Sequence, residues 1–125
     1  MGRVSDTLGA VPPLVWPVLW LVAIVVVSLL PQASPAARVL TLNGRDFLAH
    51  LIAYGVFGTL IFWSLGGCSL GVRSLGMIFL PLTLGTGIEL LQPLVGRTCS
   101  WLDVCADGVG VVIALVAAMV WTAFR

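Results

Sequence analysis

The sequence predicts an all-α membrane protein in which four transmembrane helices form one antiparallel bundle. The first observation behind this prediction is composition: 60% of the 125 residues are hydrophobic, only 9% are charged, and lysine is absent. A water-soluble domain carries about 25% charged residues, so the surface of this protein must face lipid. The second observation is that the apolar residues gather in continuous runs. The length suits a single domain over residues 1–125.

Each apolar run is long enough to cross a bilayer. The runs cover residues 14–30, 47–65, 74–94 and 101–124, close to the ~20 residues that span a ~30 Å hydrocarbon core. Only helices and closed barrels satisfy every backbone group in lipid. Because the runs do not alternate apolar with polar residues, helices are favoured over strands. The short connections at 66–73 and 93–100 favour antiparallel neighbours.

The first run has an alternative interpretation as a cleavable signal peptide, because small residues follow it at 33–37. Its apolar stretch is longer than the usual ~7–15 residues, and it lacks a preceding basic cluster. We therefore expect it to be retained as a span. Within the later runs small residues recur at helical spacing, as at Gly55 and Gly58 or Gly108 and Gly110. Such residues let membrane helices approach closely, so we assign them a packing role.

Polar residues gather at one end of the predicted bundle. Asp46, His50 and Tyr54 recur every four residues and form one stripe, and Glu89 and Gln92 also share a helix face. An ionisable residue inside a span costs ~2.5–3.5 kcal/mol on insertion scales and usually marks a functional site. We therefore predict a ligand-binding site at this end. Its candidate residues are Arg45, Asp46, His50, Tyr54, Glu89, Gln92, Arg97, Ser100, Asp103 and Asp107.

Several of these residues also have a purely structural interpretation. Asp46, Ser100 and Asp103 fall where side chains cap helix N-termini. Tyr54 would suit an interfacial aromatic belt, and His50 alone would suit a hydrogen-bonded core position. Glu89 lies about one turn inside a span and has no such explanation, which favours a functional cluster. Carboxylates this close in a low dielectric do not all ionise easily. We therefore expect that at least one carboxyl keeps its proton, shares it with His50 or is balanced by a bound cation.

In chain order the polar positions form one pattern. It reads Asp46-x3-His50-x3-Tyr54, then Glu89-x2-Gln92-x4-Arg97-x2-Ser100-x2-Asp103-x3-Asp107-x2-Gly110. This pattern, with the Leu29-Leu30-Pro31 exit from the first run, resembles the VanZ-like family of small bacterial membrane proteins from about residue 14 onward.

The chain departs from that family at three positions. Phe47 stands where the family often has lysine, Asp107 where it commonly has asparagine, and Ala114 where it commonly has glycine. The resemblance implies a bacterial membrane protein of the cell envelope. It also implies a link to glycopeptide resistance through the family's namesake, although the family's biochemical activity is generally unassigned, and fold does not transfer function.

Positive charge sets the expected orientation. If Arg45 and Arg97 belong to the site, the other arginines favour termini in the cytoplasm and a site at the outer face of the bacterial cytoplasmic membrane. Those remaining arginines are Arg3, Arg73 and Arg125 on the terminal side and Arg38 on the other.

The cysteines do not form a pattern that indicates a metal or another cofactor. Outside the cytoplasm a disulfide between Cys99 and Cys105 is allowed. Their spacing matches no common zinc signature, so we expect no metal. The formal net charge of +1 argues against a nucleic-acid partner.

Three functions fit these residues. The first is binding of an anionic lipid or lipid-linked cell-envelope precursor, with Arg45 and Arg97 on phosphate or carboxylate. The second is a proton- or ion-coupled transporter or accessory subunit, which would require a homodimer or another membrane-protein partner. The third is an intramembrane acid–base enzyme acting on a lipid headgroup, in which His50, Glu89 and Asp46 would be catalytic. No residue pattern names a nucleophile, so we place the enzyme last. We favour the first function because it accounts for the arginines and for a site at the outer face.

Overall fold

The computed structural model describes residues 13–31, 33–40 and 46–125, and within these residues the protein is helical with no strand. The four main helices are α2 (Val15–Ser28), α4 (Asp46–Ser64), α5 (Leu70–Leu91) and α6 (Trp101–Ala123). They coincide with the four predicted runs to within a few residues, so the all-α fold class is confirmed. Two short elements were not predicted: one lies in the connection after the first run, and the other is a tighter turn that ends the third run. They are α3 (Pro35–Leu40) and the 3₁₀ helix η1 (Gln92–Val95).

Three helical segments are long and apolar enough to cross a membrane. They are α4, the continuous segment Leu70–Val95 and α6, with mean hydropathies of 1.6, 1.6 and 2.2. Large apolar side chains cover their outer surfaces, as at Phe79 and Trp121, which are 61% and 60% exposed. Such a surface is stable only against lipid. The chain is therefore a multi-pass membrane protein. Helix α2 has 14 residues, about 21 Å at 1.5 Å per residue. This is shorter than the ~20 residues that span a bilayer, so the fourth span stays a prediction.

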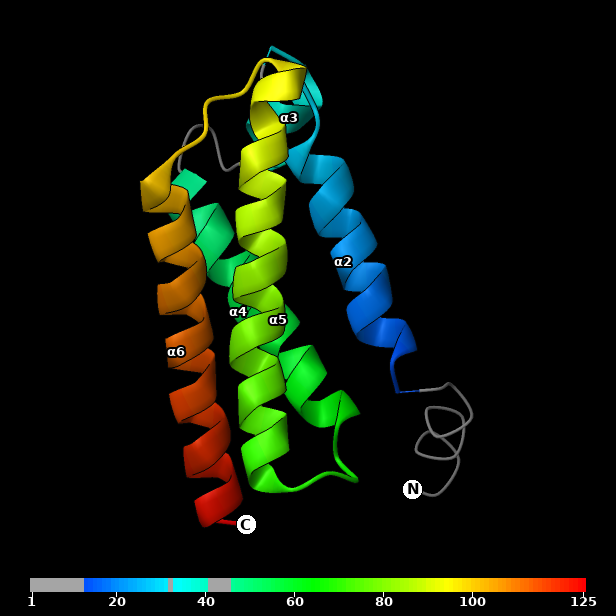
Figure 1. Cartoon of the computed structure of the whole chain (residues 1–125), viewed down its shortest axis with the longest axis vertical. Helices are drawn as coiled ribbons and strands as arrows, with labels where there is room; N and C mark the ends of the chain where they lie inside the picture. The colour runs from blue at the N-terminus through cyan, green and yellow to red at the C-terminus, as the bar shows by residue number, and fades with distance from the viewer. Residues whose placement is uncertain (1–12, 32, 41–45) are drawn as a thin grey trace.

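Successive main helices run in opposite directions, as Figure 1 shows. Helices α4, α5 and α6 pack against one another, whereas α2 packs mainly on α4 and leans away from the other two (Figure 1). The centre is filled by buried apolar side chains, including Phe57, Ile61 and Val111. A second apolar group of Phe62, Met77 and Ala118 lies closer to the end that carries the C-terminus. Among the described residues, the interior toward that end is mainly apolar, and the polar cluster lies toward the other end.

The loop between α5 and α6 is shaped by a glycine. Gly96 has a φ of 76° at the end of η1, in the left-handed region that side chains other than glycine rarely adopt. Its backbone N–H donates to the carbonyl of Pro93 at 3.2 Å. This turn ends the helical segment and sends the chain back over the bundle, which brings Ser100 next to α5.

Helices α4 and α6 touch through glycine. A Cβ atom on Gly110 would overlap the carbonyl oxygen of Leu51, and one on Gly55 would lie 3.1 Å from the carbonyl oxygen of Gly110. The obstacles are backbone atoms, which cannot rotate away. This contact confirms the packing role expected for Gly55 and Gly110 and fixes the distance between the two helices that carry most of the polar cluster.

We expect Gly110→Ala to destabilise the protein by about 1–3 kcal/mol or more, because the new methyl group must push α4 away from α6. Gly108→Ala is the matched control: its Cβ would meet only a Leu82 methyl group at 3.7 Å. The control gains helix propensity without a clash and should be neutral or slightly stabilising. Thermal unfolding of both variants in detergent measures the difference. Equal unfolding temperatures would contradict the close helix contact.

Candidate functional site

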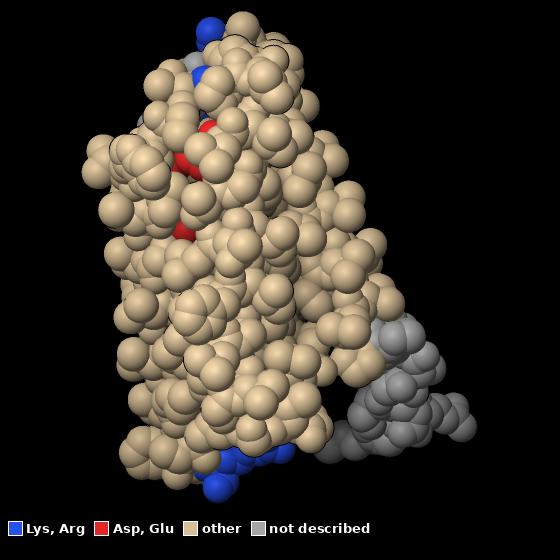
Figure 2. Space-filling model, in the orientation of Figure 1, with Lys and Arg blue, Asp and Glu red and all other residues tan. Residues whose placement is uncertain are grey.

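A buried polar cluster lies where α5 ends and α4 and α6 begin. Three of its side chains, Glu89, Gln92 and Asp107, are each 1% exposed, and His50 and Asp103 are 8% and 9% exposed. On the face shown in Figure 2, acidic atoms are visible only near this end, sunk among uncharged residues, whereas arginine atoms lie at both ends. The predicted gathering of polar residues at one end is thus present in the structure.

His50 links α4 to α6 through two carboxylates. Its Nδ1 lies 2.7 Å from Oδ1 of Asp107, and its Nε2 lies 3.7 Å from Oδ2 of Asp103. Asp103 and Asp107 are one helical turn apart on α6 and therefore present both carboxylates to the same side. Because a carboxylate accepts hydrogen bonds, the short contact assigns a proton to Nδ1.

Tyr54 lies one turn deeper on the same stripe of α4. Its ring stacks on the ring of His50, with centroids 5.8 Å apart and an interplanar angle of 8°. Within the described part of the chain, neither the Tyr54 hydroxyl nor Oδ2 of Asp107 has a hydrogen-bond partner. Two unpaired polar atoms at such depth are costly, and in native structures they mark sites that bind water, ions or ligands.

Glu89 is held by two donors. The backbone N–H of Ser100 donates to Oε1 at 2.6 Å. The amide end of Gln92 lies 3.0 and 3.1 Å from the two carboxylate oxygens, and because oxygens repel at that distance, the amide is oriented with its nitrogen donating. Ser100 thus contributes its backbone and not its hydroxyl, which makes no capping bond on α6.

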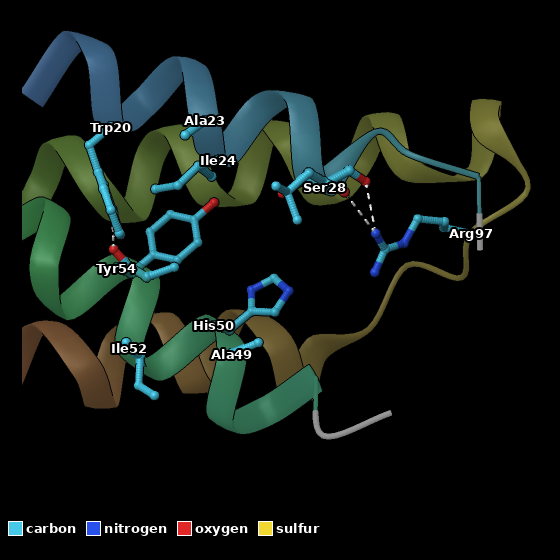
Figure 3. Close-up of a pocket in the computed structure, with 11 residues that line it drawn as sticks. Trp20, Ala23, Ile24, Ser28, Ala49, His50, Ile52, Tyr54 and Arg97 are labelled. Carbon is cyan, nitrogen blue, oxygen red and sulfur yellow. Dashed lines mark hydrogen bonds between the residues drawn. The ribbon is translucent and has the colours of Figure 1, made fainter. Parts of the chain in front are cut away.

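Arg97 lies at the mouth of a cavity beside this cluster. Its Nη1 donates to the carbonyl oxygens of Val27 and Ser28 at 3.3 and 3.2 Å, just where α2 ends (Figure 3). Within the described residues, the rest of the guanidinium makes no hydrogen bond or ion pair, so it retains donors for a ligand.

The cavity has a volume of about 270 Å³ and lies between α2 and α4. Tyr54 and His50 face it from α4, and Trp20, Ala23 and Ile24 face it from α2 (Figure 3). Trp20 also joins the two helices, because its Nε1 donates to the carbonyl of Ala53 at 2.8 Å. The cavity therefore has apolar walls with polar groups at one end.

The structure separates the predicted site residues into three groups. The residues that it brings into one buried cluster are His50, Tyr54, Glu89, Gln92, Asp103 and Asp107, with Ser100 through its backbone. Arg97 lies beside them at the cavity. Asp46 is half-buried in the first turn of α4 and bonds to no other described residue. Arg45 falls outside the described residues.

Sequence reasoning missed the contribution of α2 and of one glycine. Trp20 and Ser28 line the cavity, and only their position on an otherwise apolar run could have indicated it. A Cβ on Gly85 would lie 2.6 Å from Oδ2 of Asp107 and 2.9 Å from Cε1 of Tyr54. Glycine at this position therefore makes the room that these two side chains occupy.

The cysteines take no part in the cluster. Cys68, Cys99 and Cys105 are all exposed and free. The disulfide considered between Cys99 and Cys105 is not formed in the structure.

Comparison of the chain with protein-family models, curated proteins and solved structures found no match. The function therefore has to be inferred from the chemistry of the site.

We expect Gly85→Ala to destabilise the protein by about 1–3 kcal/mol and to displace Asp107 from His50, because the methyl group takes the space of Oδ2. Gly87→Ala is the matched control two residues further along α5, where a Cβ would meet nothing within 4 Å. Thermal unfolding measures the first effect, and the ¹⁵N chemical shifts of the single histidine measure the second. Unchanged histidine shifts in Gly85→Ala would contradict the arrangement.

Proposed function

We propose that this chain is a VanZ-like protein of the bacterial cytoplasmic membrane that binds the anionic headgroup of a lipid or lipid-linked cell-envelope precursor. In this proposal α2 is a fourth span, both termini are cytoplasmic, and the site opens to the outer face. The observation that carries the proposal is the cavity, which combines the Arg97 guanidinium with walls of apolar side chains. A ligand that matches both parts is an amphiphile.

Arg97 supports an anionic headgroup. A guanidinium binds phosphate or carboxylate through paired, charge-assisted hydrogen bonds. The two described bonds of Arg97 go to the carbonyls of Val27 and Ser28, which hold the side chain at the cavity without forming an ion pair. The helix end that those carbonyls terminate carries partial negative charge, which also orients the cation. Arg97 is thus preorganised and still available to an anion.

The apolar walls support a hydrocarbon chain. Ile24 and Val27 of α2 and Ile52 of α4 line the cavity, and the outer surfaces of both helices are apolar as well. A chain lying along these side chains would remain in a hydrophobic environment as it leaves the cavity. His50, Tyr54 and Ser28 add hydrogen-bonding groups for the polar part.

A proton- or ion-coupled transporter is the second candidate, favoured by the buried pair of His50 and Asp107. Beyond Tyr54, however, the described interior is filled by apolar side chains such as Phe57, Phe62 and Met77. A proton pathway needs polar groups or water along its length. For this reason we place lipid binding first. Enzymatic turnover by His50, Glu89 and Asp46 is third, since Asp46 makes no contact that would orient His50.

We expect Arg97→Gln to weaken binding of anionic lipids by about 10-fold or more, since a hydrogen bond to a charged group contributes about 1.5–3 kcal/mol. Arg73→Gln is the matched control, because Arg73 is also half-buried and also donates to a backbone carbonyl, that of Phe62 at 3.0 Å, at the opposite end. Native mass spectrometry of the detergent-purified protein with phosphatidylglycerol, undecaprenyl phosphate or phosphatidylcholine measures binding. Equal loss in both variants, or no preference for anionic lipid, would overturn the proposal.

We also expect Ala23→Trp to reduce anionic-lipid binding without changing charge, because the indole would fill the cavity that Ala23 lines. Ala117→Trp is its control, since Ala117 is an exposed alanine on α6 and does not line that cavity. Both indoles face lipid or an apolar wall, so neither should unfold the protein. If the two variants bind lipid equally well in the same assay, the cavity is not the binding site.

A further inference from the structure

The geometry points to a divalent metal site in which His50, Glu89 and Asp103 are the ligands and Asp107 positions the histidine. The ion would be of the Zn²⁺ class. This inference goes beyond lipid binding and departs from the sequence-based expectation of no metal, which considered only the spacing of the cysteines. Because the ligands come from three different helices, no short sequence motif could have identified them.

The three ligand atoms are already close together. One ligand atom from each of His50, Glu89 and Asp103 lies within 4.8 Å of the other two. The separation between Nε2 of His50 and Oδ2 of Asp103 is 3.7 Å. Ligands about 2.0–2.2 Å from a tetrahedral zinc ion are roughly 3.4 Å apart, so closure needs movements of about 1 Å. Small side-chain rotations supply this much.

Asp107 prepares the histidine for metal. Its Oδ1 lies 2.7 Å from Nδ1 of His50, and both side chains are buried. In metalloproteins a ligating histidine commonly donates its second N–H to a carboxylate, which fixes the tautomer and directs the other nitrogen's lone pair at the ion. Here the proton on Nδ1 leaves the lone pair on Nε2, on the side of Asp103. Without a cation, that lone pair would face a carboxylate.

The charge of the cluster independently favours a cation. Glu89, Asp103 and Asp107 bring three carboxylates together, and each of these residues as a whole is at most 9% exposed. In the described part of the chain, their ion pairs are with His50 alone, and Arg97 gives its described bonds to carbonyl groups. Oδ2 of Asp107 is buried and has no described partner. Uncompensated buried charge is strongly unfavourable, and a divalent ion offsets it.

The mixed ligand set selects among metals. Imidazole suits Zn²⁺, Fe²⁺ and related ions, whereas Mg²⁺ and Ca²⁺ prefer oxygen ligands alone. Three protein ligands leave a further coordination position, as in zinc sites that bind water or substrate. His50 belongs both to this set and to the cavity lining, so the ion would lie beside the proposed headgroup site.

The experiment measures metal binding directly, in detergent and without added lipid, so its outcome does not depend on the lipid proposal. The background is Cys68→Ser, Cys99→Ser and Cys105→Ser, because exposed thiols would also bind zinc. After removal of metal with a chelator, Zn²⁺ is titrated by calorimetry and Co²⁺ by its visible absorption. We expect one ion per chain, with no comparable binding of Mg²⁺.

The variants identify the ligands. We expect His50→Gln and Asp103→Asn to lower Zn²⁺ affinity by about 100-fold or more, and Asp107→Asn by about 10–100-fold, the range seen for outer-shell partners. Asp46→Asn removes a carboxylate from the same end without removing a ligand and should stay within about threefold. Helix content of each metal-free variant, measured by circular dichroism, verifies folding.

Absence of stoichiometric Zn²⁺ binding by the parent protein would overturn the inference, whatever the variants do. Equal Zn²⁺ affinity in the parent and in folded Asp103→Asn would overturn it as well. Without a bound ion, His50 would hold the carboxylates together as an imidazolium, and the ¹⁵N shifts of its ring would report two protonated nitrogens. A metal-loaded parent protein would show one protonated nitrogen and one shifted by the ion.

Discussion

The short contact between His50 and Asp107 is the constraint on which the rest of the polar end depends. Both groups are buried in a protein whose outer surface faces hydrocarbon, where an unpaired polar group has no water to turn to. Their pairing requires α4 and α6 to lie close together, and glycine at position 110 permits this. It also requires space beside Asp107, which glycine at position 85 leaves open. The small residues and the charged residues therefore serve one arrangement.

The helices and the gathering of polar residues were predictable because they follow from local regularities. Hydropathy located the four main helices, and a spacing of four residues placed His50 and Tyr54 on one stripe. The contacts that give the site its chemistry are set by packing between helices. No local pattern shows that Ser100 holds Glu89 through its backbone and not through its hydroxyl. The short helix α3 was not predicted for another reason: its six residues are too few to show a helical periodicity of apolar side chains.

The polar end combines two environments that use different physics. Glu89, Asp103, Asp107 and His50 are packed away from the surroundings, so their electrostatic interactions are strong. Arg97 is only half-buried and is anchored to a helix end by two carbonyl bonds. A buried acidic cluster of this kind suits coordination of a metal ion, as inferred above, whereas a half-exposed arginine suits reversible binding of an anionic ligand. His50 belongs to both environments, since it binds Asp107 and also lines the cavity.

Helix α2 is attached mainly along one side, to α4, and the cavity lies along that same seam. Under the proposed function, a lipid that enters between these two helices would reach the cavity by lateral diffusion in the bilayer, without passing through water. Its supply is then governed by its mole fraction among the surrounding lipids. A site with modest affinity would then be occupied by a lipid that is a minor component of the membrane. Its occupancy would follow changes in membrane composition. Under the proposed function, the one-sided attachment of α2 would make occupancy of the site depend on the composition of the bilayer around it.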